Sequence, residues 1–136
     1  IDHFWNEVYP FKLKDRFGLL LKDIKEFNHH ILFNETDEII GWAVAFLRDG
    51  EVWFFILVSA ENQNKGYGNM LIDSLKQDFK NLCGWVIDHN NDLKQDGSTY
   101  YTPIQFYLKH GFVVMEDRIE TNIISAVKIK YEAKIK

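Results

Sequence analysis

The sequence predicts one domain of the mixed α/β (α+β) class, built on a central and largely antiparallel sheet. The chain has 136 residues, of which 46% are hydrophobic and 15% aromatic, which suits a single buried core. A strand, an amphipathic helix and a second strand follow one another between residues 52 and 88, and this order implies a parallel pair joined by a crossover helix. No repeat or Pro/Gly/Ser-rich linker divides residues 1–136.

The first half of the chain reads as a helix followed by an antiparallel meander. Apolar residues recur at helical spacing over residues 12–27. Strands are expected at 29–33, 38–47 and 52–58, the last a nearly continuous apolar run of the kind covered on both faces. Asp49 and Gly50 form the turn between the last two strands, because Asp-Gly supplies the positive φ angles of a tight hairpin.

The second half begins with an amphipathic helix over residues 66–79, where apolar side chains recur at every fourth position. A second helix is expected over 103–110, with Gly111 as its C-terminal stop. Shorter apolar runs predict strands at 84–88, 112–115 and 122–131.

Charge and composition exclude several classes of function. A net charge of -4 argues against non-specific nucleic-acid binding, and no apolar run is long enough to span a membrane. Cys83 is the single cysteine, so neither a disulfide framework nor a thiolate zinc site is expected. We expect a reducing, cytoplasmic compartment instead. The chain opens at Ile1 without a signal-peptide pattern, so we expect an N-terminal element to be missing.

The segment Gln63–Gly68 carries the clearest chemical signal. It follows the buried strand 52–58, and its two glycines open the helix that begins at residue 66. A helix N-terminus offers unpaired N–H donors and a partial positive charge, while Lys65 adds a cation and Gln63 an amide donor. Together these groups predict an anion site, most naturally for phosphate.

Three phosphate-binding patterns compete for this segment. A P-loop needs G-x-x-x-x-G-K-[ST], which is absent from the chain. A dinucleotide fingerprint needs a third glycine where Leu71 stands, and the seven residues between Val58 and Gly66 are too many for its tight turn. In favour of this pattern, Asp88 lies at a suitable distance along the chain for a ribose-binding acid. The pattern Q/R-x-x-G-x-G/A of a pyrophosphate loop is matched in full by Gln63–Gly68.

That string, placed between a buried strand and a helix, resembles the acetyl-CoA site of the GNAT superfamily of N-acetyltransferases. Residues 106–112, Phe-Tyr-Leu-Lys-His-Gly-Phe, are similar to the family segment whose tyrosine faces the departing sulfur of coenzyme A. The resemblance covers about residues 28–130 and implies a GNAT-like fold with one splayed parallel strand pair and helices on both faces. Residues 85–89 and 101–104 are similar to a bacterial subgroup.

The resemblance implies acetyl-CoA as the acyl donor and Tyr107 as the general acid. A backbone strand would pair with the pantetheine arm, with an N–H of Leu57 or Val58 donating to the thioester oxygen, and the glycine loop would hold the pyrophosphate. The cofactor-binding residues implied in this way are Ile56, Leu57, Val58, Gln63, Asn64, Lys65, Gly66, Tyr67, Gly68 and Asn69.

The general base is less clearly marked. Glu51 begins a strand on which some family members carry a basic carboxylate, and Asp88 and His89 end the second parallel strand. An amine can also lose its proton through ordered water. No metal is expected, because a calcium loop from Asp88 would need glycine where Leu93 stands.

The sequence therefore predicts an N-acetyltransferase that acts on a primary amine, of a small molecule or a peptide, by direct transfer in a ternary complex. The alternative is a catalytically silent CoA-binding sensor or partner module; a nucleotide-binding oxidoreductase is a weaker rival, and a homodimer is compatible with the sequence. Tyr100 and Pro103 replace the Asn and Ala usual in the family, and the long loop 89–101 is assigned to substrate selection. Aromatic candidates for the acceptor pocket are Trp5, Tyr9, Trp42, Tyr100 and Tyr101.

Overall fold

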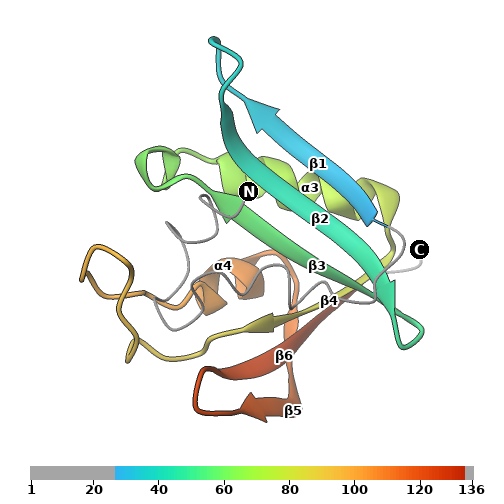
Figure 1. Ribbon diagram of the computed structural model, residues 1–136. Helices are drawn as coiled ribbons and strands as arrows, with labels where there is room; N and C mark the ends of the chain where they lie inside the picture. The colour runs from blue at the N-terminus through green and yellow to red at the C-terminus, as the bar shows by residue number, and fades with distance from the viewer. Residues whose placement is uncertain (1–26, 134–136) are drawn as a thin grey trace.

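A six-stranded sheet forms the centre of the computed structural model, which describes residues 27–133 (Figure 1). Its strand order is β1-β2-β3-β4-β6-β5, and every neighbouring pair is antiparallel except β3 and β4, which confirms the predicted parallel pair. The strands are β1 (Phe27–Phe33), β2 (Ile39–Arg48), β3 (Glu51–Val58), β4 (Asn81–Val86), β5 (Val113–Glu120) and β6 (Ser125–Glu132).

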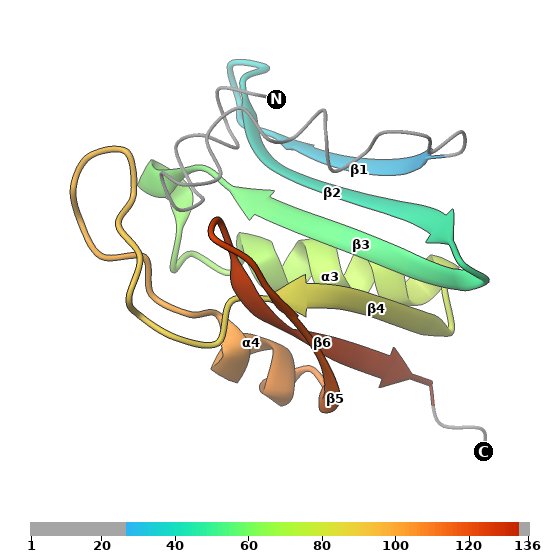
Figure 2. The ribbon, with the colours of Figure 1, turned by 60° about the horizontal axis from the view of Figure 1, so that its bottom comes forward.

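Two α-helices and one short 3-10 helix connect these strands: η2 (Ala60–Asn62), α3 (Tyr67–Asp78) and α4 (Ile104–Lys109). Both α-helices contribute side chains to one core cluster, so they pack on the same face of the sheet (Figure 2). The predicted helix over residues 12–27 falls almost wholly outside the described residues, so a helix on the opposite face remains a prediction. Within residues 27–133, no helix combines the length and apolar character needed to cross a membrane.

β2 is buried on both faces because its side chains alternate between two clusters. Ala43 and Ala45 face α3, where their small size allows the helix to approach the sheet closely. Trp42 and Val44 point to the opposite face and pack with Leu57 of β3. The sheet therefore contributes to a core on each side.

The turn chemistry follows the sequence prediction. Asp49 and Gly50 have φ angles of 53° and 77°, as the β2–β3 hairpin requires. Gly111 has a φ of 86° and follows α4, which confirms it as the residue that ends the helix.

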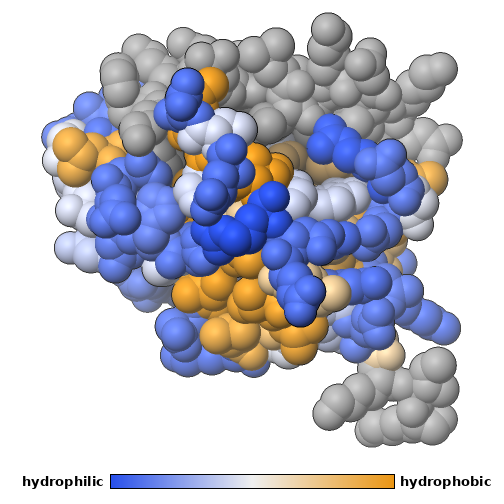
Figure 3. All heavy atoms as spheres, turned by 90° about the horizontal axis from the view of Figure 1, so that it is seen from below, coloured by the Kyte–Doolittle hydropathy of each residue, from blue (hydrophilic) through white to orange (hydrophobic). Residues whose placement is uncertain are grey.

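Several strand boundaries differ from the prediction, among them those of β4 and β5. β4 begins at Asn81 rather than residue 84, because residues 81–86 pair along their whole length with β6. β5 runs to Glu120 rather than residue 115, and its charged second half fits an edge strand that is largely exposed. Apolar side chains gather over β5 and α4 (Figure 3), which carry the exposed residues Leu108, Val113 and Val114.

The parallel pair is held at one position only. Trp53 of β3 and Cys83 of β4 are the single registered partners between these strands in the described sheet. Beyond that point β3 and β4 diverge toward their C-terminal ends, as Figures 1 and 2 both show. The edge of β3 that faces β4 is therefore left without strand partners over its last residues.

Aromatic rings pack at the point of divergence. Trp53 stacks on Trp85 with ring centroids 5.5 Å apart. Phe54 lies against Gly84, where a Cβ atom would come within 3.1 Å of its ring. The same Phe54 ring contacts Tyr107 edge-on at 5.7 Å. Gly84 thus leaves the space in which Phe54 connects β3 to α4.

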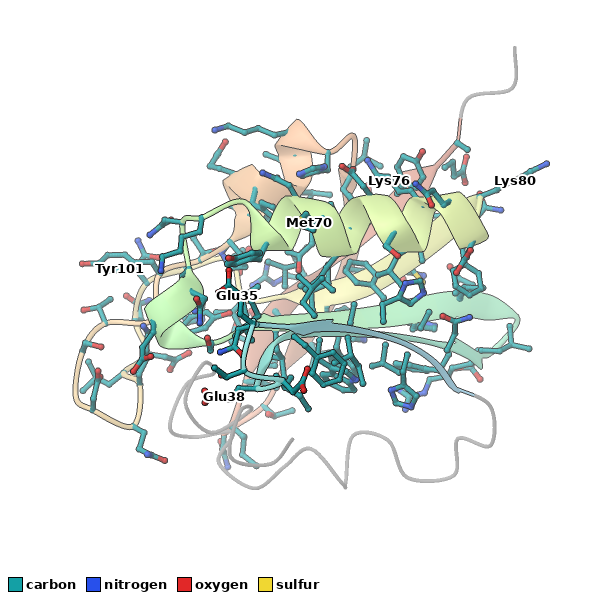
Figure 4. All side chains as sticks on the ribbon, turned by 90° about the horizontal axis from the view of Figure 1, so that it is seen from above. Glu35, Glu38, Met70, Lys76, Lys80 and Tyr101 are labelled. Atoms are coloured by element: carbon teal, nitrogen blue, oxygen red, sulfur yellow. The ribbon has the colours of Figure 1, made fainter. Side chains whose placement is uncertain are left out.

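We predict that Leu75→Ala lowers the free energy of unfolding by about 2–5 kcal/mol, because Leu75 is fully buried between α3 and the sheet. Met70→Ala on the same helix (Figure 4) is the matched control, because Met70 is 54% exposed. Its effect should stay within about 0.5 kcal/mol. Urea unfolding followed by circular dichroism measures both, and equal effects would contradict this packing of α3.

Candidate functional site

A groove of about 520 Å³ opens where β3 and β4 separate. Ile56 and Val58 line it from β3, and Phe106 and Tyr107 line it from α4. The loop that leads into α3 supplies a polar wall between these elements. Its volume lies within the usual range of small-molecule sites, and one end is apolar while the other is rich in backbone and amide groups.

Hydrogen bonds tie the polar wall to the start of β2 and to the end of β3. The Ser59 N–H donates to Ile40 O at 2.9 Å, and the Asn62 side-chain amide donates to Ser59 Oγ at 2.7 Å. The Gln63 amide donates to Val58 O at 3.2 Å. Gln63 therefore fixes the loop against the strand, in addition to lining the groove.

The N-terminus of α3 faces the groove through a left-handed turn. Gly66 caps the helix with a φ of 86°, and Asn64 has a φ of 64°. The first bond of this turn runs from Met70 N to Gly66 O at 3.2 Å. The N–H groups that precede Met70 therefore have no partner within the helix, and they carry the positive end of its dipole. This is an anion-binding arrangement.

Gly68 allows a close approach between α3 and α4. A Cβ atom at Gly68 would lie 3.3 Å from the ring of Phe106, which also lines the groove. A side chain at Gly68 would therefore force the ring of Phe106 to shift, so glycine suits both the close helix packing and the open groove.

The structure brings most of the predicted cofactor residues together. Those that line the groove are Ile56, Val58, Gln63, Asn64, Gly66, Gly68 and Asn69. The side chain of Leu57 points to the opposite face, where it is buried beside Trp42, because side chains alternate along a strand. Lys65 and Tyr67 belong to the same segment, but they do not line the groove.

Tyr107 is held at the groove by aromatic neighbours. It is only 9% exposed, and its ring packs against Phe106 at 5.1 Å and Phe112 at 5.4 Å. Together with Phe54, these rings fix the position of its ring from several sides. A phenol hydroxyl on a fixed ring at a groove wall is suited to proton donation at a defined point.

Two of the three candidate bases are held in ion pairs away from the groove. Glu51 lies at the opposite end of β3 and accepts a hydrogen bond from Lys128 Nζ at 2.8 Å, which lowers the pKa of its carboxyl group. Asp88 accepts bonds from both terminal nitrogens of Arg118, at 2.8 and 3.2 Å, and the Arg118 guanidinium likewise lowers the pKa of Asp88. A carboxylate stabilised in its ionised form is a weak base.

His89 is the third candidate and also lies outside the groove lining. Its Nδ1 accepts a hydrogen bond from Asn91 N at 3.1 Å, and its Nε2 lies 3.9 Å from Asp92. None of the three predicted bases is therefore placed at the groove by this structure.

Cys83 is buried at the junction of β3 and β4, and its thiol lies 3.5 Å from Val52 O. Burial, reinforced by the nearby Glu51 carboxylate, raises the pKa of Cys83 to about 12. A thiol with this pKa is almost entirely protonated at neutral pH, which makes it a poor nucleophile.

Among residues 27–133, no cluster of three or more His, Cys, Asp or Glu side chains is placed to hold a metal ion.

The groove also contains residues that the sequence motifs did not single out. Asn62 lies just ahead of the glycine segment, and Lys94 comes from the long loop between β4 and α4. Tyr100 and Tyr101, expected near the acceptor, do line the groove, and Tyr101 is 73% exposed. Trp42 belongs instead to the core, where its indole donates to His29. The two remaining aromatic candidates, Trp5 and Tyr9, lie outside the described residues.

The family assignment follows from comparison with known proteins. The sequence profile of the Acetyltransferase (GNAT) domain matches residues 26–114, which is more than half of the chain. The chain belongs to the GNAT acetyltransferase family. No curated protein sequence gives a significant match.

Solved structures of several acyltransferases have the same fold. An aminoglycoside 6'-N-acetyltransferase complexed with coenzyme A matches with a TM-score of 0.69 at 13% identity, over 99% of this chain and 89% of that chain. An acyl-CoA N-acyltransferase from Pseudomonas aeruginosa matches with a TM-score of 0.69 at 13% identity, over 96% and 86%. A phosphinothricin acetyltransferase from Sinorhizobium meliloti in complex with AcCoA matches with a TM-score of 0.58 at 16% identity, over 87% and 66%.

Proposed function

We propose that this GNAT protein transfers an acetyl group from acetyl-CoA to a primary amine by direct transfer in a ternary complex. The observation that supports it is a single groove that joins the N-terminus of α3 to Tyr107 along the unpaired edge of β3. Two proteins with this fold are described in complex with CoA or AcCoA, which supports the same class of donor here.

The groove offers a suitable partner for each part of the donor. The N–H groups at the start of α3 suit the diphosphate, and the edge of Ile56–Val58 suits the amide-bearing pantetheine arm, which can pair with it as a strand would. The apolar surface of Phe106 and Tyr107 lies next to this edge. Acetyl-CoA supplies an activated acyl group and a thiol leaving group.

The residues of this chain then act at defined atoms. A backbone N–H near Leu57 or Val58 donates a hydrogen bond to the carbonyl oxygen as negative charge develops on it. The amine nitrogen bonds to the carbonyl carbon, the bond from carbon to sulfur breaks, and Tyr107 donates its hydroxyl proton to the departing sulfur. The proton lost by the amine passes to water, which later restores the proton of Tyr107.

A dedicated general base is not part of this proposal. The described residues that line the groove include no Asp, Glu or His. Glu51 and Asp88 are held in ion pairs elsewhere. The acceptor therefore reacts as the fraction of amine that is neutral, with water as the proton acceptor. Cys83 does not carry the acetyl group, because its thiol is buried and protonated.

Release of free CoA in the presence of amines tests the activity. We expect the protein to release CoA with at least one class of a panel that contains amino sugars, polyamines, amino acids and peptides. Mass spectrometry should then show one acetylated amine for each CoA released. Binding of CoA without release across the whole panel would favour the catalytically silent CoA-binding module, and failure to bind CoA would overturn both.

We predict that Tyr107→Phe keeps the affinity for CoA while reducing turnover by about ten- to a thousand-fold, because the ring packing remains and only the proton donor is removed. Tyr131→Phe is the matched control, since Tyr131 packs on Phe112 but does not line the groove. Its turnover should equal that of the wild type. Full turnover in Tyr107→Phe would remove this residue from the mechanism.

We further predict that Gly66→Ala and Gly50→Ala lower the stability of the protein to a similar extent, whereas only Gly66→Ala weakens the binding of CoA. Both glycines have positive φ angles and open space where the added methyl group would lie, so each substitution should lower the free energy of unfolding by about 1–2 kcal/mol. Only Gly66 lines the groove, so only Gly66→Ala should raise the Kd of CoA, by about tenfold or more. Calorimetric titration measures the Kd, and an equal Kd for the two variants would contradict the placement of the phosphates.

A further inference from the structure

Lys94 stands on a short hairpin within the loop that joins β4 to α4. Leu93 and Thr99 form a backbone bridge, and Lys94 N donates to Ser98 O at 2.8 Å. The Gly97 N–H donates back to Lys94 O at 3.0 Å, which closes the turn. The backbone of Lys94 is therefore held by bonds that do not involve its side chain.

The base of this loop is also fixed. Tyr100 N donates to Asp92 O at 2.9 Å, and Thr102 N donates to Asn90 Oδ1 at 2.8 Å. The Thr102 hydroxyl donates to Ile87 O, just past the end of β4. The loop is thus anchored on both sides of the hairpin, and the position of Lys94 beside the groove follows from the fold.

The charge of the groove differs from that of the whole chain. The protein has 20 Asp and Glu residues against 16 Lys and Arg residues. Among the described residues that line the groove, however, there is no carboxylate, and Lys94 is the one formal cation. A groove that contains a cation and no anion favours an anionic ligand over a cationic one.

Lys94 lines the same groove as the wall that precedes α3. That wall contains Asn62, Asn64 and Gly66, and Gly66 caps the N-terminus of α3. Tyr101, from the same loop as Lys94, extends beside this wall in Figure 4. Within the described part of the chain, Lys94 forms no ion pair within 4.0 Å. Asp96 is its electrostatic neighbour, and the Asp96 carboxylate accepts two hydrogen bonds from Ser98.

We propose that Lys94 is a phosphate-binding residue of the donor site and contacts the diphosphate of CoA together with the N-terminus of α3. This inference rests on the proposed function, which supplies CoA as the ligand. It assigns the loop between β4 and α4 to donor binding, whereas the sequence suggested substrate selection. A cation at this position repels an ammonium acceptor and attracts a phosphate, so the donor is the better partner.

Binding of CoA and dephospho-CoA to Lys94→Met tests this assignment. Dephospho-CoA retains the diphosphate but lacks the 3'-phosphate. We expect the Kd of both ligands to rise by the same factor, about ten- to a hundred-fold, because one charge-assisted contact to the shared diphosphate is lost. The difference from the wild type should shrink as the salt concentration rises.

Two further variants act as controls. Lys94→Arg keeps the charge and should restore most of the affinity. Lys80→Met removes the same charge at the far end of α3 (Figure 4), away from the groove lining, and should leave both Kd values unchanged. Thermal melting of each variant checks that the fold is intact.

Other outcomes would overturn the assignment. A loss of affinity for CoA alone would place Lys94 at the 3'-phosphate. Unchanged Kd values together with a raised KM for the amine would show that Lys94 contacts the acceptor. Failure of the wild-type protein to bind CoA would instead overturn the proposed function, so the two failures are distinguishable.

Discussion

The site depends on one constraint, which is that β3 and β4 pair at a single position and then separate. A parallel pair normally continues its ladder along both strands, whereas here the registered contact is limited to Trp53 and Cys83. The remaining residues of β3 keep their antiparallel bonds to β2 on the other side. The backbone of Ile56–Val58 is therefore held rigidly on one edge and left open on the other, which makes it a preformed receptor for an extended chain.

The side chains around this opening explain why it does not close. Phe54 lies over Gly84 of β4, and the same ring contacts Tyr107 and Phe112. A larger residue at position 84 would displace Phe54, and with it the aromatic cluster that holds the ring of Tyr107. The same Phe54 ring therefore links the place where the strands separate to the proposed acid.

Sequence patterns predicted those parts of the fold and site that depend on local chemistry. The turn at Asp49–Gly50 and the glycine that opens α3 need particular backbone angles, and such needs are visible in the residues themselves. The second half of β5 was not predicted, because an exposed edge strand with charged residues has no apolar alternation to detect. The position of Lys94 in the groove was not predicted for a different reason. The path of a long loop is set by distant contacts, such as the bond from Thr102 to Ile87, and these leave no periodic pattern in the sequence.

The candidate bases illustrate the same limit and bear on the chemistry. Glu51 and Asp88 have the right chemical group, but cross-strand partners decide whether such a group is available, and Lys128 and Arg118 hold both in the ionised form. Moving either carboxylate to the groove would break a paired charge, which is costly once the partner is partly buried. In the proposed mechanism, catalysis therefore depends most on positioning and on donors aimed at developing charge, and least on proton abstraction. The proposed mechanism therefore relies chiefly on the edge of β3 and on Tyr107, which line the same groove.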